Sequence, residues 1–451
     1  MMLKPTTDNN CGNYQVPNEH CKNLLSIANC TITDLCEQNP DLLIFPQSLG
    51  EYHDDIENSY IFSLHDNILR TGNIMGFVGR NDTQLAISSR FTEKNDKRDY
   101  FLHYMLQKVF SINLFKFDQT SNKENIWDFL LYLFPYYLKK AYLQGIYKTY
   151  KREEYNDANV KGMIDVKRHI RVNIPFCGKI TYTTREHSYD NAVTQLIRHT
   201  IEYIKAHSFG SGVLTSDTET RDIVSRFCFI TQNSYNKNAR QKIITANLKP
   251  VSHPYFTEYK MLQKICLRIL QREKLTFGEE KDKVYGLLFD GAWLWEKYLN
   301  IILKDDFKFS DNKRKTGGYR LFADKDGNKF QEIYPDFISR KPPIVIGDAK
   351  YIPLGNQKKY VESSERATSI YYKTITYMYR FESAYGFLLF PNPETPYDEE
   401  YTIINTNGVI RKLGLAIPQK AENFADFQSK MNANEQLNLI SLFQARLNGR
   451  N

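Results

Sequence analysis

Two aspartates and a lysine in the C-terminal half of the chain have the types and spacing used in metal-assisted hydrolysis of a phosphodiester. They lie in the segment YPDFISRKPPIVIGDAKYI, residues 334–352, as Asp336, Asp348 and Lys350. Carboxylates hold Mg²⁺, and a bound divalent cation lowers the pKa of a water and neutralises charge on the phosphoryl oxygens. A lysine beside that water can orient it or help to deprotonate it. Asp336 and Asp348 are therefore candidate metal ligands, and Lys350 is a candidate catalytic residue.

The expected secondary structure brings these three residues together. Asp348 and Lys350 are two residues apart on a predicted strand, so their side chains project from the same face. Asp336 lies on the preceding strand, which can pair with the next one in a hairpin. Glu296, on the helix expected before them, can supply a further carboxylate. A structural ion pair between Asp348 and Lys350 also accounts for the local sequence, and this alternative stays open beside the metal site.

The elements around these residues alternate as in one α/β domain. The sequence predicts, in chain order, a helix over residues 286–303, strands over 334–339 and 343–352, a helix over 367–382, and strands over 385–392 and 409–417. A basic stretch follows the first helix, where two glycines are flanked by Lys313, Arg314, Lys315 and Arg320. A flexible basic loop beside a metal site can lie along DNA phosphates, and a solvated turn is the alternative interpretation.

The rest of the chain is predicted to hold a small β-rich module and a largely helical middle. Residues 41–92 alternate short apolar runs with turn signals, which is typical of strands. The glycines there, Gly72, Gly76 and Gly79, indicate strand turns, because neither a Lys-Ser/Thr pair nor a helix follows them as in a phosphate loop. Residues 1–40 are polar and are expected to begin without regular structure. Helices are expected over 98–116, 125–150, 191–206 and much of 215–272, and strands in the alternating segment 163–167.

Composition limits the class of protein. The 451 residues are 41% hydrophobic and 25% charged, which is ordinary for a soluble globular protein of two or three domains. The net charge of +8 is compatible with a polyanionic partner without requiring one. The seven cysteines match no zinc-binding spacing, and Asp128 and Pro135 interrupt the richest apolar stretch, which argues against a membrane span. Without an apolar signal segment, we expect a cytoplasmic protein with reduced thiols.

Several segments resemble one protein family. The PD at 335–336 with the DAK at 348–350 resembles the signature of the PD-(D/E)xK nuclease superfamily. Within it, the wider chain is similar to the McrC component of McrBC-type modification-dependent restriction systems. The likeness rests on GIYKTYKREEY followed by NVKGMIDVKRHIRVN, on ITYTTREHSYDNAVTQLI, and on YGLLFDGAWLWEKYL, and it spans roughly residues 125–420.

The resemblance implies roles for the candidate site residues. Asp336 and Asp348 would be ligands of Mg²⁺, with Mn²⁺ as a possible substitute, and Lys350 would be the catalytic lysine. Glu296 would be the acidic residue on the helix. Asp290 matches the family's Asp in an LFD pattern, with helix capping as the simpler alternative. Where the family often has Gln in the helix after the DxK strand, this chain has Lys373, which can contact a phosphate.

The resemblance also implies a partner. It predicts a hexameric AAA+ GTPase of the McrB type that recognises methylated double-stranded DNA. The partner would bind GTP, and this chain would not. The N-terminal part of the chain would contact that ring and stimulate its GTPase. No membrane partner is expected.

We therefore expect an α+β multidomain protein. Its predicted parts are an N-terminal β-rich and helical partner-binding region (1–120), a central helical and β-hairpin region (121–275), a C-terminal α/β PD-(D/E)xK nuclease core with a mixed sheet flanked by helices (276–420), and a helical tail (421–451). The predicted function is that of a type IV-like restriction endonuclease subunit that cuts methylcytosine-containing DNA and stimulates its GTPase partner. A non-catalytic adaptor that only activates an NTPase ring and a stand-alone nuclease are the alternatives.

Overall fold

A computed structural model describes residues 3–39, 42–46, 59–92, 99–110, 123–207, 210–215, 217–271, 284–310, 318–355 and 365–448. The chain forms two units. The first contains Met1–Lys123 and Gly278–Asn451, and the second contains Glu124–Phe277. The second unit is thus an insertion in the sequence of the first. Helices and several sheets occur together, which confirms the predicted α+β class.

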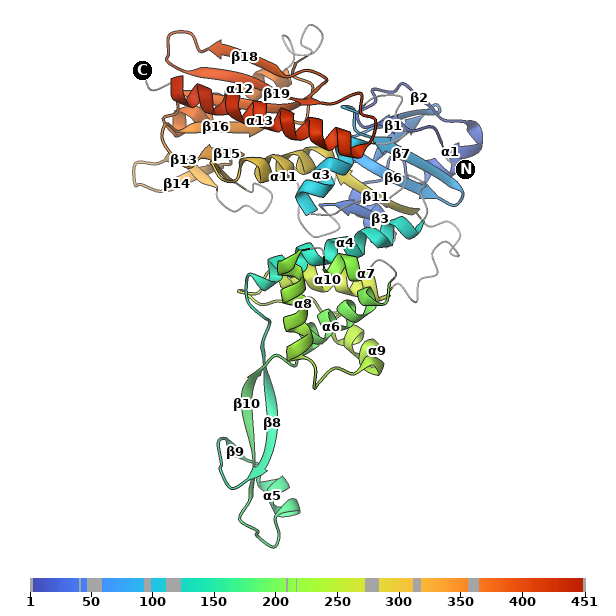
Figure 1. The fold of residues 1–451 in the computed structure, drawn as a ribbon, viewed down its shortest axis with the longest axis vertical. Coiled ribbons are helices and arrows are strands. Elements are labelled where there is room, and N and C mark those ends of the chain that lie inside the picture. The colour runs from blue at the N-terminus through green and yellow to red at the C-terminus, as the bar shows by residue number, and fades with distance from the viewer. Residues whose placement is uncertain are drawn as a thin grey trace. The chain divides into compact units, whose positions relative to one another are not determined.

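A five-stranded sheet forms the N-terminal part of the first unit (Figure 1). Its order is β1-β7-β6-β11-β3, with β1 at Thr6–Thr7, β3 at Leu42–Phe45, β6 at Ile74–Arg80, β7 at Thr83–Ser88 and β11 at Val284–Asp290. A smaller sheet has the order β2-β5-β4, with β2 at Tyr14–Gln15, β4 at Phe62–His65 and β5 at Ile68–Thr71. Helices α1 (Asn18–Leu25) and α2 (Ile32–Gln38) complete this part. Leu24, Ile74 and Leu288 belong to one buried apolar cluster across these elements.

The predicted strands in residues 41–92 are confirmed, but Gly76 and Gly79 lie within β6 and not at strand turns as predicted. Gly76 instead allows a close approach between β6 and β11. Gly76 lies in β6 with a φ of +129°, a region that favours glycine. A Cβ at this position would lie 2.1 Å from the carbonyl oxygen of Leu287 in β11. Strands β6 and β11 can therefore pair as they do only because residue 76 has no side chain.

A six-stranded mixed sheet forms the C-terminal part of the first unit. Its order is β12-β15-β16-β17-β19-β18, with β12 at Phe307–Phe309, β15 at Phe337–Ser339, β16 at Val345–Ala349, β17 at Tyr385–Pro393, β18 at Tyr397–Thr402 and β19 at Val409–Ile417. Strands β15 and β16 are antiparallel, whereas β16, β17 and β19 are parallel to one another. A separate hairpin contains β13 (Tyr319–Ala323) and β14 (Lys329–Ile333).

Helices cover this sheet and join it to the N-terminal part (Figure 1). The helix α12 (Glu365–Arg380) packs against β16 and β17, and α13 (Phe424–Asn448) packs against β19 and α3 (Tyr100–Phe110). The buried Glu435 of α13 accepts hydrogen bonds of 2.6 Å from the hydroxyls of Tyr104 in α3 and Tyr298 in α11 (Gly291–Leu303). The C-terminal helix is therefore part of the first unit's core.

Helices form the body of the second unit, and a long β-hairpin extends from it (Figure 1). The body contains α4 at Lys123–Tyr142, α6 at Ala192–Lys205, α7 at Gly210–Leu214, α8 at Thr218–Ile230, a 3-10 helix at Lys237–Ala239, α9 at Arg240–Ala246 and α10 at Tyr259–Gln271. Strands β8 (Thr149–Asp157) and β10 (Ile180–Ser188) pair antiparallel along their whole length. At the far end lie β9 (Met163–Ile164) and α5 (Val166–Val172). None of the helices that the structure describes is both long and apolar enough to cross a membrane.

The prediction of one helix over residues 286–303 is wrong in its first part. Residues 284–290 form β11, and all seven are buried in the N-terminal sheet. A strand buried on both faces is apolar throughout, so its sequence runs into the following helix without a change of pattern. The helix α11 begins only at Gly291, because Asp290 caps it by accepting hydrogen bonds from the backbone N–H groups of Ala292 and Trp293.

Two other local predictions are also wrong. The alternation at residues 163–167 gives a strand only at Met163–Ile164, because the side chain of Asp165 caps helix α5 by accepting from the N–H of Arg168. Residues 1–40 were expected to begin without regular structure. The described residues 3–39 instead contain two short strands and two helices, whose apolar side chains join the N-terminal core.

Candidate active site

The hairpin predicted around the candidate residues is present. Strands β15 and β16 pair antiparallel, with Phe337 opposite Gly347. Asp336 lies directly before β15, Asp348 lies within β16, and Lys350 lies directly after it. The structure therefore brings the three predicted residues together at one end of the hairpin.

Asp348 is a buried carboxylate that lies beside two lysines. Its side chain has no exposed surface. Two lysines compensate its charge: Lys350 forms a close ion pair with Oδ2, and Nζ of Lys373 lies 3.9 Å from Oδ1. Burying an ionised carboxylate is strongly unfavourable unless such charges are near. The arrangement therefore places two cations beside oxygens that remain able to accept further ligands.

Asp336 differs from Asp348 in its protonation. It is 8% exposed, and its Oδ2 accepts a hydrogen bond of 2.7 Å from the backbone N–H of Ala349. Burial raises the pKa of Asp336 well above its ordinary value, and the negative charges of Asp348 and Glu296 raise it further. The two aspartates are thus close enough that only one of them ionises readily.

The lysines make Asp348 the ionised member of the pair. Burial opposes its ionisation, but the charges of Lys350 and Lys373 outweigh burial and hold the pKa of Asp348 below its ordinary value. Burial also opposes the charge of Lys350, yet the pKa of Lys350 is raised, because Asp348 and Asp336 favour the ammonium form. At neutral pH the centre of the site is therefore a carboxylate beside an ammonium.

Helix α11 brings Glu296 to the edge of the site. The cap at Asp290 fixes the start of this helix, and the indole N–H of Trp295 donates to the carbonyl of Leu389 in β17 at 3.3 Å. Glu296 is partly exposed, and its charge contributes to the raised pKa of Asp336. The capping role of Asp290, which the sequence left as the simpler alternative, is present.

The donor set fits a hard divalent cation. Mg²⁺ is usually held by one or two carboxylates, with water and phosphate oxygens in the remaining positions. Asp336 and Asp348 offer two carboxyl groups, and both side chains are buried. Among the described residues, no group of three or more His, Cys, Asp or Glu side chains is arranged to hold a metal. A site of two aspartates is therefore the largest that these residues provide.

The predicted DNA-binding residues have different positions. Lys313, Arg314 and Lys315 lie outside the described residues. Arg320 lies on β13, where its guanidinium is 2.7 Å from Glu332 of β14. Lys373 lies on α12 beside Asp348 and is partly exposed, so among the described candidates it is the one that joins the site.

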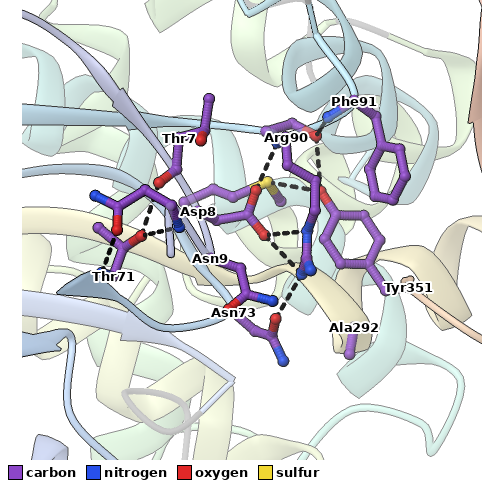
Figure 2. Close-up of polar contacts among 12 residues, drawn as sticks. Thr7, Asp8, Asn9, Thr71, Asn73, Arg90, Phe91, Ala292 and Tyr351 are labelled. Carbon is purple, nitrogen blue, oxygen red and sulfur yellow. Dashed lines mark hydrogen bonds and ion pairs between the residues drawn. The ribbon is translucent and has the colours of Figure 1, made fainter. Parts of the chain in front are cut away.

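Four residues that were not identified from the sequence, Asp8, Ser89, Arg90 and Tyr351, support the strand end that carries Lys350. Arg90 lies between the carboxylate of Asp8 and the ring of Tyr351, as Figure 2 shows. Nε of Arg90 is 2.9 Å from Asp8, and its guanidinium carbon is 5.1 Å from the centre of the Tyr351 ring. The hydroxyl of Tyr351 is 2.7 Å from that of Ser89.

This cluster connects the N-terminal sheet to the candidate site. Tyr351 directly follows Lys350, and its ring lies against Gly291 at the start of α11. Ser89 and Tyr351 are 262 positions apart in the chain, so no local spacing could reveal their contact. Only the adjacency of an aromatic residue to the DAK sequence hinted that the strand end is buried.

Together, the fold and the site define a mixed α/β protein with a buried carboxylate–lysine cluster at the end of a hairpin. The family model of the McrBC 5-methylcytosine restriction system component matches residues 69–391, which is well over half of the chain. The chain belongs to this family.

Two solved structures are similar to the chain. One is a refined half-complex from a tetradecameric assembly of Thermococcus gammatolerans McrB AAA+ hexamers with bound McrC. It has 16% sequence identity and a TM-score of 0.42, and the match covers 96% of this chain and 100% of that chain. The other is the cryo-EM structure of the Thermococcus gammatolerans McrBC complex, with 13% identity, a TM-score of 0.30, and coverage of 67% of this chain and 87% of that chain. Comparison with curated proteins gives no match.

Proposed function

We propose that this chain is the DNA-cleaving subunit of its restriction system. It hydrolyses phosphodiester bonds of methylcytosine-containing DNA, and Asp336, Asp348 and Lys350 form its active site. The observation that carries the proposal is Asp348, a completely buried carboxylate whose charge is balanced by Lys350 and Lys373. A buried ion pair is seldom favourable in a purely structural role, because well-packed apolar residues at the same place are often at least as stable. Membership of the restriction-system family supports the same conclusion.

The proposal gives each residue a role. Asp336 and Asp348 would hold Mg²⁺ or Mn²⁺, which supplies charge neutralisation on the phosphoryl oxygens and an acidified water. Lys350 forms a close ion pair with Asp348, so its amino group lies where it can orient the attacking water or a phosphoryl oxygen or help to deprotonate that water. Lys373 is partly exposed beside Asp348 and is placed to contact a phosphate of the strand. Glu296 adds negative charge at the edge of the site.

The test is cleavage of methylated DNA by the complete system with GTP and Mg²⁺, using the wild type and Asp348→Asn. We expect no detectable cutting by Asp348→Asn, while its stimulation of the partner GTPase is kept. Asp326→Asn, which changes an exposed aspartate in the turn between β13 and β14, is the matched control and should cut normally. Undiminished cutting by Asp348→Asn would reject the site. Wild-type protein that stimulates the GTPase but never cuts would favour the adaptor function instead.

A partner of the AAA+ GTPase class is part of this proposal, and the end of the long hairpin offers a surface for it. The structure describes seven exposed apolar side chains within fourteen residues there: Met163, Ile164, Val166, Ile170, Val172, Ile174 and Phe176. Concentrated exposed apolar side chains are typical of protein interaction sites. The described residues before position 111 have only three large exposed apolar side chains, at Leu25, Tyr60 and Ile68. The hairpin end is therefore the better candidate for ring contact than the N-terminal region.

Ile174→Asp tests this contact. Ile174 is 68% exposed, so the change should leave folding intact but weaken co-elution with the GTPase in gel filtration. Phe322→Asp, at a 52% exposed position on β13, is the control and should co-elute normally. If both variants bind the GTPase as the wild type does, the hairpin end is not the docking surface.

A further inference from the structure

A cavity of about 730 Å³ lies in the second unit, where the long hairpin joins the helical body. It is bordered by the chain segment that leads from α4 into β8, by the end of β10, by α8 and by the loop before α10. The volume is within the range of about 300–1,000 Å³ in which proteins hold small ligands. Its lining is dominated by six aromatic rings: Tyr142, Tyr147, Tyr150, Tyr189, Tyr255 and Phe256.

The back wall of the cavity is fixed by aromatic packing and hydrogen bonds. Tyr147 meets Phe256 edge-on, with ring centres 5.0 Å apart, and it lies 5.4 Å from Tyr259. The hydroxyl of Tyr259 accepts from the backbone N–H of Tyr147 at 3.2 Å and donates to the carbonyl of Gly145 at 2.7 Å. These contacts hold the wall in place before any ligand binds.

The front of the cavity presents rings that have unused faces. Tyr150 is 71% exposed and Tyr255 is 62% exposed, although both line the cavity. Tyr255 packs edge-on against Phe256 at 5.1 Å, and Tyr150 lies close to the ring of His187. Exposed aromatic faces next to a preformed wall can stack on a flat group that enters the cavity.

The charge of the cavity is positive. Its lining includes Lys148 and Arg226 but no aspartate or glutamate. In the described part of the chain neither cation has an ion-pair partner, and Nζ of Lys148 lies 4.5 Å from the centre of the Tyr189 ring. Unpaired cations around an aromatic cavity favour a ligand that is both flat and anionic.

We propose that this cavity binds a nucleotide, with the base stacked on Tyr150 or Tyr255 and the phosphate held by Arg226 and Lys148. A nucleotide combines a flat aromatic base with a phosphate, and base stacking on aromatic side chains with a cationic groove is how proteins hold unpaired strands. The ligand is either one unit of a single-stranded DNA segment or a free nucleotide. This inference does not rest on the proposed function, because the cavity is in the second unit and Asp336 and Asp348 are in the first.

The test measures binding to the full-length chain with two fluorescent probes. One is a single-stranded oligodeoxynucleotide that contains 2-aminopurine, and the other is etheno-AMP. Stacking on a tyrosine should change the emission of the probe that binds. We expect Arg226→Gln and Tyr255→Ala each to weaken binding about tenfold, because each removes one phosphate or base contact.

Two controls match these variants. Arg221→Gln changes an exposed arginine on the same helix α8 that does not line the cavity, and Tyr379→Ala changes a tyrosine of the first unit that is 87% exposed. Both should bind the probes as the wild type does. Tighter binding of the oligonucleotide would identify a DNA strand as the ligand, and tighter binding of etheno-AMP would identify a free nucleotide.

The proposal is overturned if neither probe binds, or if the cavity variants bind as well as the controls. Asp348→Asn separates this result from the proposed function. It should bind both probes normally even though it does not cut DNA, so cleavage and cavity binding can fail independently.

Discussion

Replacing Arg90 with methionine tests the buried ion pair that supports the strand end at Lys350. Asp8 is completely buried, and its carboxylate accepts hydrogen bonds from the backbone N–H and the guanidinium of Arg90. Arg90→Met keeps much of the side-chain volume but leaves the carboxylate without its cation. Removing one partner of a buried ion pair costs about 3–5 kcal/mol. We expect the free energy of unfolding of the first unit to fall by about this amount at pH 8.

The effect should depend on pH in a direction that the structure defines. Burial raises the pKa of Asp8 to about 6, although the charge of Arg90 opposes the shift. The pKa of Asp8 in the unfolded chain is near 3.8, so the folded state binds the proton more tightly. The contribution of Asp8 to the free energy of unfolding therefore falls as the pH rises from about 4 to 6. Over about two pKa units the loss is about 3 kcal/mol. Without Arg90 the pKa of Asp8 rises further, so the destabilisation of the folded state by ionised Asp8 continues to grow above pH 6.

The measurement is urea denaturation at pH 5 and pH 8, followed by tryptophan fluorescence. Trp293 and Trp295 are buried in the first unit, and the third tryptophan, Trp127, belongs to the second unit. All proteins therefore carry Trp127→Phe, so that the emission reports on the first unit. At pH 5, where Asp8 is mostly protonated in both proteins, the difference should shrink to about 1–2 kcal/mol. The double variant Asp8→Asn/Arg90→Met should recover much of the loss at pH 8. A difference that is the same at both pH values would refute the assignment of the penalty to Asp8.

Three further predictions concern the supports of the site and can be measured by thermal or urea unfolding. Tyr351→Phe keeps the ring but removes the hydroxyl bonded to Ser89, and should cost about 1 kcal/mol; no loss would mean that this bond contributes nothing net. Gly76→Ala should cost more than about 3 kcal/mol, because its Cβ would collide with the Leu287 carbonyl; a soluble variant of normal stability would contradict the close approach. Asp290→Ala should cost about 1 kcal/mol through loss of the α11 cap, and Asp290→Asn should restore most of it.

The site could be found from the sequence because its central residues are close in the chain. Asp336, Asp348 and Lys350 lie within fifteen positions, and the period of a strand decides which of their side chains share a face. Their chemical roles remain predictions until cutting is measured. The pairing of Asp8 with Arg90 spans 82 positions, and no periodicity or local spacing encodes such a contact.

In the fold, too, elements encoded by local sequence patterns were predictable, and elements that depend on contacts distant in the chain were not. Strands of the β-rich module were predictable because turn residues separate short apolar runs. Strand β11 was not, because a fully buried strand has no alternation and its apolar run continues into α11. Its place between β6 and β3 depends on residues more than 190 positions earlier in the chain.

The central place of β11 also sets an order of events during synthesis. A ribosome that has released residues 1–123 has released β3 and β6 but not the strand that lies between them. The whole second unit, Glu124–Phe277, emerges before β11 does, so it can fold while the N-terminal sheet is still incomplete. During this interval the edges of β3 and β6 are unpaired, and such edges can pair with other chains. Nascent chains of this protein are therefore exposed to misassembly, and they should depend on chaperones, until residue 290 has left the ribosome.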